Sequence, residues 1–315
     1  ESPKNSVYHC NLGVIEHNLK KLDQAKISFL LAINLNNKNV DAHYNLAKLY
    51  KELGLTDAAL SSYGIVLSLE PSHLNALINL GNILVDVGRL DDAIIQFKKV
   101  IELNPKDTLA LVNLGNVYRR MGLAEKAINT YGRVLSIHAH DGLRIRSAVT
   151  LPVVYKSLDH IKEVRESLEL KLEKLLEEDL EVSDPSLETS TTNFFLAYQN
   201  YNDRDLQKII ANIHLNSCSR LGWTAPHCNG VKRERGKIKI GFLSAYFYRH
   251  SVGRMMVGLI SQIPKNLFEV VVITTNGQKD PIALKIQGAA DHLVYLSENL
   301  IEMQEEIGRQ KLDVL

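Results

Sequence analysis

The stretch NALINLGNILVDVGRLDDAIIQFKKVIELNP, residues 75–105, decides the fold of the first half of the chain. It holds one copy of a pattern that recurs at a fixed interval and is marked by Asn11, Asn45, Asn79 and Asn113. In every copy a leucine follows the asparagine, and an alanine and then an aromatic residue come at fixed places further on. Small and bulky residues repeated at this period predict pairs of helices that stack on one another.

Two further repeated positions mark where the helices of each copy should end. A glycine stands where the first helix of a pair should end, and a proline separates one pair from the next. These positions are Gly54, Gly88 and Gly122 for the glycine, and Pro71 and Pro105 for the proline. The first copy has Lys20 and Asn37 in their place, and the fourth has Ala139 instead of the proline. The pattern resembles tetratricopeptide repeats, and we predict about four of them in residues 1–144.

The four repeated asparagines are candidate binding residues. They share one position of the first helices, so they should form a row along the concave groove of the array. A carboxamide offers two donors and an acceptor, which suits the main chain of an extended peptide. We therefore predict that Asn11, Asn45, Asn79 and Asn113 bind a peptide, with Asn82 and Asn116 as a partial second row. The alternative is that each asparagine bridges neighbouring helices.

Composition limits the class of partner. The 37 basic and 36 acidic residues leave a net charge of +1, which argues against a partner held by charge, such as nucleic acid or an anionic membrane. The three cysteines form no C-x-x-C pair, so we predict reduced thiols, a cytoplasmic location and no metal site. No apolar run reaches the roughly 18 residues of a membrane span. Because the chain starts without methionine and stops within an apolar run at Leu315, we expect a piece of a longer protein.

After the repeats the pattern changes twice. Residues 145–232 read as a helical connector, with one long amphipathic helix over 157–180 and a break near Asn202. Residues 233–315 alternate strands with helices, which predicts a parallel sheet. The expected strands span 238–243, 268–275, 292–296 and 312–315, and the later helices 281–290 and 298–310. Trp223 and His227 lie in a turn-rich loop and are expected to pack against the sheet domain.

His250 is the candidate catalytic residue. It lies between the apolar run IKIGFL, predicted to be a strand buried on both faces, and a helix that begins at Ser251. Ligands of open α/β sheets gather beyond the carboxyl ends of the strands, so a histidine at this junction is well placed. The alternative is that His250 only caps the helix or lies in solvent. With Gly253 alone, a dinucleotide fingerprint is not supported.

Four stretches carry a resemblance to a known family. They are DGLRIRSAVTLPV (141–153), FFLAYQNYNDRDLQ (194–207), GWTAPHC (222–228) and the loop YFYRHSVGR (246–254). Together with the repeats they resemble the O-linked N-acetylglucosamine transferase / SPINDLY family, in its bacterial-type branch. The resemblance implies an α + α/β fold: a tetratricopeptide superhelix, a helical connector, and the incomplete first Rossmann-like lobe of a GT-B glycosyltransferase over 233–315.

The same resemblance implies a function. The family transfers N-acetylglucosamine from UDP-GlcNAc to Ser or Thr of proteins, with inversion and without a metal or any cofactor beyond the sugar donor. His250 matches its active-site histidine, as a general base or as a group that orients the acceptor. Asp313 falls where animal members have a second active-site histidine. The donor-binding residues would lie beyond Leu315, so the chain alone should be inactive.

Several expectations about partners accompany this reading. They include a protein acceptor in the repeat groove, a nucleotide sugar, no nucleic acid or membrane, association of the chain with itself through the repeats, and a nucleocytoplasmic location in a eukaryote. The alternatives are transfer of fucose, transfer of glucose to asparagine, and a peptide-binding scaffold without activity.

Overall fold

The computed structural model describes residues 4–189, 193–229, 236–275, 277–297 and 299–315. It divides the chain into two compact units, Glu1–Ile213 and His214–Leu315. The described part of the first unit is helical, and the second contains a parallel sheet. No described helix is both long and apolar enough to cross a membrane.

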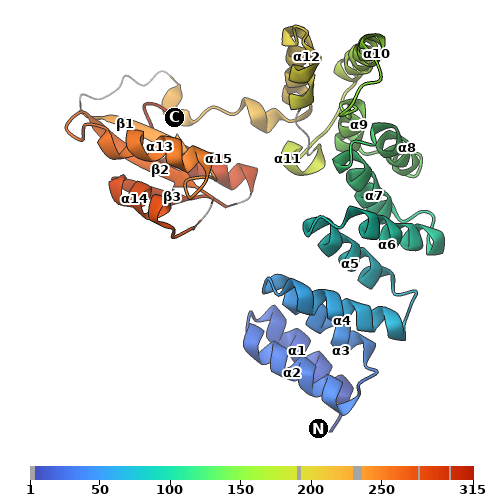
Figure 1. The fold of residues 1–315 in the computed structure, drawn as a ribbon. Helices are drawn as coiled ribbons and strands as arrows, with labels where there is room; N and C mark the ends of the chain where they lie inside the picture. The colour runs from blue at the N-terminus through green and yellow to red at the C-terminus, as the bar shows by residue number, and fades with distance from the viewer. Residues whose placement is uncertain (1–3, 190–192, 230–235, 276, 298) are drawn as a thin grey trace. The chain divides into compact units, whose positions relative to one another are not determined.

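The first unit begins with four helix pairs that follow one another along the chain (Figure 1). The two helices of a pair pack on each other, and the second helix of each pair packs on the first helix of the next. The helices are α1 (Ser6–Asn18), α2 (Leu22–Leu35), α3 (Val40–Glu52), α4 (Thr56–Leu69), α5 (Leu74–Asp86), α6 (Leu90–Leu103), α7 (Thr108–Arg120) and α8 (Ala124–Leu135).

Small residues let the two helices of a pair approach, and aromatic rings fill the space between them. The alanines at the repeated position are fully buried, as are the aromatic residues one turn later; they are Ala25, Ala59, Ala93, Ala127, Phe29, Tyr63, Phe97 and Tyr131. The Phe97 ring covers Gly81 so closely that a Cβ there would lie 2.6 Å from it. The predicted repeat packing is confirmed.

The ends of the first helices follow the same period. Gly54, Gly88 and Gly122 have φ of 71°, 80° and 76°, a left-handed conformation that glycine adopts without strain. Lys20 takes this place in the first pair with φ of 60°. At the other end, an N-cap side chain accepts from the backbone of α1, α3, α5 and α7; these caps are Asn5, Asn39, His73 and Asp107, again one repeat apart.

Helices of the predicted connector follow the repeats, and the first unit ends within the last of them. They are α9 (Asp141–Ala148), α10 (Leu158–Leu176), α11 (Pro185–Glu188), the 3-10 helix η1 (Phe194–Gln199) and α12 (Arg204–Ser217). A shared core that includes Leu172, Leu196 and Ile213 joins α10, η1 and α12. The predicted break near Asn202 is present, because Asn200 has a left-handed φ of 59° between η1 and α12. The long helix is shorter than predicted and stops at Leu176.

The second unit is a small α/β structure. Its elements are η2 (Ser219–Gly222), η3 (Pro226–Cys228), β1 (Ile238–Leu243), α13 (Ser251–Gln262), β2 (Phe268–Thr274), α14 (Pro281–Ala289), β3 (His292–Tyr295) and α15 (Leu300–Arg309). The strands run parallel in the order β1-β2-β3. Where a fourth strand was expected, a single parallel bridge joins Val314 to Ile240 of β1.

The sheet corrects one prediction. β1 is not buried on both faces, since Leu243 is 47% exposed. The strand buried on both faces is β2, which has β1 on one side and β3 on the other. Val270 and Val272 of β2 share a core with residues of α13 and α14, whereas Val271 and Ile273 pack with Leu296 and α15. Position in the sheet, which an apolar run does not encode, decides the burial.

Candidate functional site

The loop between β1 and α13 carries His250. The side chain of His250 is the N-cap of α13, where its Nδ1 accepts from the backbone N–H of Val252 at 3.3 Å. The ring is half-buried and stacks on Tyr246, with centroids 4.6 Å apart and planes at 26°. The structure thus places His250 at the carboxyl end of β1, and it also shows the capping contact of the alternative interpretation.

Two residues outside the loop hold its shape. The carboxylate of Asp280 accepts from the backbone N–H of Arg249 at 2.8 Å and also caps α14, so it joins the loops that follow β1 and β2. Gly253 lies under the loop, where a Cβ would collide with the carbonyl oxygen of Tyr248. The pKa of Asp280 is lowered by these backbone N–H groups and by Arg249, against an opposing effect of desolvation. Asp280 and Gly253 therefore fix the position of His250.

The cap contact limits what a neutral His250 can do. An imidazole nitrogen that accepts a hydrogen bond carries no proton, so a neutral ring capped at Nδ1 has its proton on Nε2. Nε2–H is a donor, and it can hold the oxygen of a hydroxyl in place. To accept a proton at Nε2 the ring must change tautomer and give up the cap. The arrangement favours an orienting role over that of a general base.

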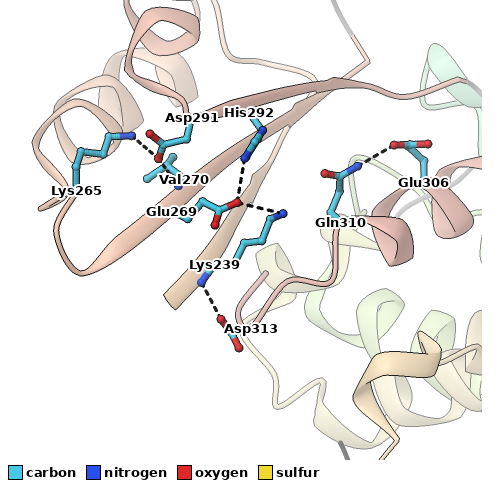
Figure 2. Close-up of polar contacts among 9 residues, drawn as sticks. All are labelled: Lys239, Lys265, Glu269, Val270, Asp291, His292, Glu306, Gln310 and Asp313. Atoms are coloured by element: carbon cyan, nitrogen blue, oxygen red, sulfur yellow. Dashed lines mark hydrogen bonds and ion pairs between the residues drawn. The ribbon is translucent and has the colours of Figure 1, made fainter. Parts of the chain in front are cut away.

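Asp313 lies elsewhere in the sheet. Its carboxylate accepts from the backbone N–H of Lys239 at 2.7 Å, near the amino end of β1 (Figure 2). An ion pair joins the Lys239 side chain to Glu269 at 3.2 Å, and His292 Nε2 lies 2.9 Å from the Glu269 carboxylate in the same region. His250 lies in the loop that follows the opposite end of β1, and the strand itself rises about 13 Å over the four residues from Lys239 to Leu243. The structure does not bring Asp313 and His250 together.

The groove asparagines make contacts between repeats. The side-chain amide of Asn45 donates to the Cys10 sulfur at 3.9 Å, that of Asn79 to the Tyr44 hydroxyl at 3.1 Å, and that of Asn113 to the Asn82 oxygen at 3.0 Å. Each acceptor lies on the first helix of the preceding pair. Asn11, in the first pair, is exposed. The bridging role that the sequence left open is present, and each carboxamide keeps further hydrogen-bonding capacity.

A pocket of about 470 Å³ opens beside the last of these asparagines. Helices α5 and α7 and the segment after α9 line it, with Phe97 and two residues near η1; His250 is not part of it. Its polar lining residues are Asn82, Asn113, Asn116, Arg119, Arg120, Thr150 and Asn193. Its apolar lining residues are Val85, Phe97, Val117, Val149, Leu151, Val153 and Phe195. The volume falls in the range of small-ligand sites, about 300 to 1,000 Å³.

Arg146 of α9 makes buried contacts where the repeats meet the connector. The sequence did not predict these contacts. The residue is only 5% exposed. Its guanidinium donates to the carbonyls of Leu187, Glu188 and Thr189 at 2.7 to 2.9 Å, and to the Asn116 side chain at 3.0 Å. Burial lowers the pKa of Arg146. A buried guanidinium held mainly by carbonyl groups fixes α9 to the segment around α11.

Trp223 and His227 pack within the second unit as predicted. The Trp223 ring lies against Gly308 of α15, and His227 Nε2 donates to the carbonyl of Leu312 at 3.1 Å. Within the described ranges, no group of three or more His, Cys, Asp or Glu side chains could hold a metal ion.

Family models identify the repeats. The model described as tetratricopeptide repeat matches residues 7–39 and 40–73, a second model with that description matches 110–145, and one described as TPR repeat matches 81–122. The four helix pairs are therefore tetratricopeptide repeats. No curated protein matches the sequence at a significant level.

Comparison with solved structures gives several similar chains. A K341M mutant of the O-GlcNAc transferase of Thermobaculum terrenum aligns with 87% of this chain at 17% identity and a TM-score of 0.51. The chain spans 45% of the length of that enzyme. The tetratricopeptide protein YrrB aligns with 63% of this chain, over 93% of its own, at 18% identity and a TM-score of 0.48. The MamA protein aligns with 57% of this chain, over 98% of its own, at 24% identity and a TM-score of 0.46.

Proposed function

We propose that this chain is the acceptor-binding part of a protein O-glycosyltransferase, which transfers N-acetylglucosamine from UDP-GlcNAc to Ser or Thr. One observation supports the proposal above all. A tetratricopeptide array continues through a connector into a parallel α/β unit that carries a histidine at the carboxyl end of its first strand. The O-GlcNAc transferase of Thermobaculum terrenum aligns with this chain over both units.

The His250 loop gives the proposal a chemical basis. Nε2–H of His250 would donate to the acceptor hydroxyl and hold it in line with the sugar donor, while the cap at Nδ1 keeps the ring in that tautomer. Such positioning requires a rigid loop, which Asp280 and Gly253 provide. The donor would be bound by residues outside this chain, as the resemblance to the family implies.

A scaffold without activity is the second candidate. The 470 Å³ pocket lies in the repeat unit and does not include His250. Tetratricopeptide grooves bind peptides, and a peptide-binding array needs no catalytic group. The two candidates share the groove and differ in whether a sugar is transferred.

Mass spectrometry of modified proteins separates these candidates. The natural protein that carries this chain is incubated with an acceptor extract and with UDP-GlcNAc, UDP-glucose or GDP-fucose in turn. The proposal requires N-acetylhexosamine on Ser or Thr, with UDP-GlcNAc as the effective donor. Fucose on Ser or Thr, or hexose on Asn, would establish one of the related activities. Peptide binding without transfer from any donor would establish the scaffold.

The matched variant for this assay is His250→Asn. Asparagine is among the residues that helices prefer as an N-cap, so the variant should keep the α13 cap while it removes the imidazole. A rate of transfer equal to that of the wild type would exclude His250 from the chemistry.

A further inference from the structure

We propose that the large pocket of the repeat unit, about 470 Å³ in volume, binds a carboxylate of the peptide together with an adjacent apolar side chain. The inference rests on the proposed peptide-binding groove and specifies what that groove selects. It concerns the pocket between α5, α7 and the segment after α9.

The lining of the pocket is positively charged. Among the described residues, Arg119 and Arg120 line the pocket, and no aspartate or glutamate does. Arg120 is fixed in place because its Nη1 donates to the carbonyl of Val85 at 2.7 Å. A guanidinium has five N–H donors in a planar fork, so this contact leaves Arg120 donors that can pair with a carboxylate. The local charge is therefore positive although the chain as a whole is nearly neutral.

Two carboxamides of the pocket can pair with the main chain of a peptide. The bond from Asn113 to Asn82 uses one amide hydrogen of Asn113 and the oxygen of Asn82. Within the described part of the chain, the Asn113 oxygen and the Asn82 amide group have no further partner and remain available to a ligand. One accepts and the other donates, which matches the alternating groups of a peptide main chain.

The walls of the pocket define the neighbouring residue of the peptide. The apolar lining residues of the pocket include Phe97 and Val117 as well as Val153 and Phe195. Val153 is 47% and Phe195 44% exposed, so a bound side chain can cover apolar surface that now faces water. The expected ligand is thus an extended peptide with an apolar residue close to an acidic group.

Fluorescence anisotropy with the 315-residue chain tests the proposal. The labelled peptides carry a leucine and a glutamate one to three residues apart in a background of serine and asparagine, with both ends blocked. Replacing the glutamate by glutamine removes the charge and keeps the shape. We expect the best peptide to bind at least tenfold more weakly after this change, which corresponds to about 1.4 kcal/mol. A second set, with a free terminal carboxylate in place of the glutamate, tells a side-chain source from a chain end.

Protein variants assign the effect to the pocket. Arg120→Gln should reduce the difference between the glutamate and glutamine peptides severalfold, and the remainder measures what Arg119 contributes in a double-mutant cycle. Arg133→Gln is the matched control, because it removes an exposed positive charge of α8 that does not line the pocket. It should leave the difference intact. If Arg120→Gln is poorly folded, the comparison of the two peptides on the unchanged protein still tests the carboxylate.

The inference is overturned if glutamate and glutamine peptides bind within twofold of each other, or if no peptide of either set binds at low salt. It is equally overturned if Arg133→Gln removes the charge preference as fully as Arg120→Gln, since the effect would then be one of net charge. Sugar transfer plays no part in these measurements. A failed transfer assay would therefore refute the proposed enzyme and leave the binding result standing.

Discussion

Substitution of Gly253 by alanine should displace the loop that carries His250. A Cβ at this position would collide with the carbonyl oxygen of Tyr248, and it would lie 2.9 Å from the Tyr248 nitrogen and 3.0 Å from the Tyr246 oxygen. These are backbone atoms, so no change of rotamer relieves the contact. Overpacking of this kind costs about 1 to 3 kcal/mol.

Gly258 of the same helix provides the control. It is exposed, and a Cβ there meets nothing within 4 Å. Replacing a helical glycine with alanine is favourable by about 1 kcal/mol. Gly258→Ala should therefore stabilise the unit, and the difference between the two variants measures the collision with the loop.

Urea unfolding followed by tryptophan fluorescence is the assay. Trp223 is the only tryptophan of the chain, and it packs on Gly308, so its signal reports the second unit. Hydrogen exchange at the backbone N–H groups of Tyr248 and His250 reports the loop itself, because they donate to Tyr246 and Tyr248 at 2.8 and 2.6 Å. If Gly253→Ala is as stable as Gly258→Ala and its loop amides stay protected, the reasoning about the loop is wrong.

Three other substitutions follow from the structure. His250→Asn should leave the unfolding free energy within about 0.5 kcal/mol of wild type, because asparagine can keep the cap. It should lower the transfer rate of the natural protein about 10²-fold, because the acceptor hydroxyl is no longer held in line, and a rate near normal would remove His250 from the mechanism. Lys20→Gly should raise the unfolding free energy of the repeats by about 1 kcal/mol, because it relieves a left-handed φ of 60°. Chemical denaturation followed by circular dichroism measures the change. Gly88→Ala is the opposite substitution, and a gain in stability from both variants would contradict the argument from φ. Arg146→Met should lower the unfolding free energy by about 3 kcal/mol or more, since it leaves three carbonyls without their donor, and an unchanged melting temperature would show that water replaces the guanidinium.

The repeats could be predicted from the sequence because their contacts are local. The Phe97 ring packs on Gly81, which lies within the same repeat, so a fixed period records both members of the contact. The N-caps carry the same signal. The caps recur at the same period as the groove asparagines, so the repeat pattern could also have predicted them; they are Asn39, His73 and Asp107.

The other contacts join residues that do not recur at the repeat period, so the period could not predict them. Arg146 lies in a stretch that the sequence marked, but its acceptors are backbone carbonyls far along the chain, which leave no trace in residue type. The groove asparagines share one position, yet their acceptors differ from repeat to repeat: a thiol, a phenol and another amide. For His250 the sequence indicated the position, the residue type and a helix cap as one alternative, and the geometry of the loop revealed that Nδ1 is the accepting nitrogen and which tautomer this contact requires.

The buried contacts of Arg146 predict which end of the repeat array unfolds first. A stack whose repeats contact only their neighbours loses structure from its ends, and the end with the weaker interface melts first. At the fourth pair Arg146 ties α9 to three carbonyls, whereas the first pair has the strained Lys20 at its turn. In this 315-residue chain, amide protection should therefore rise from α1 towards α9, so that the pocket beside Asn113 opens after the first helix pair.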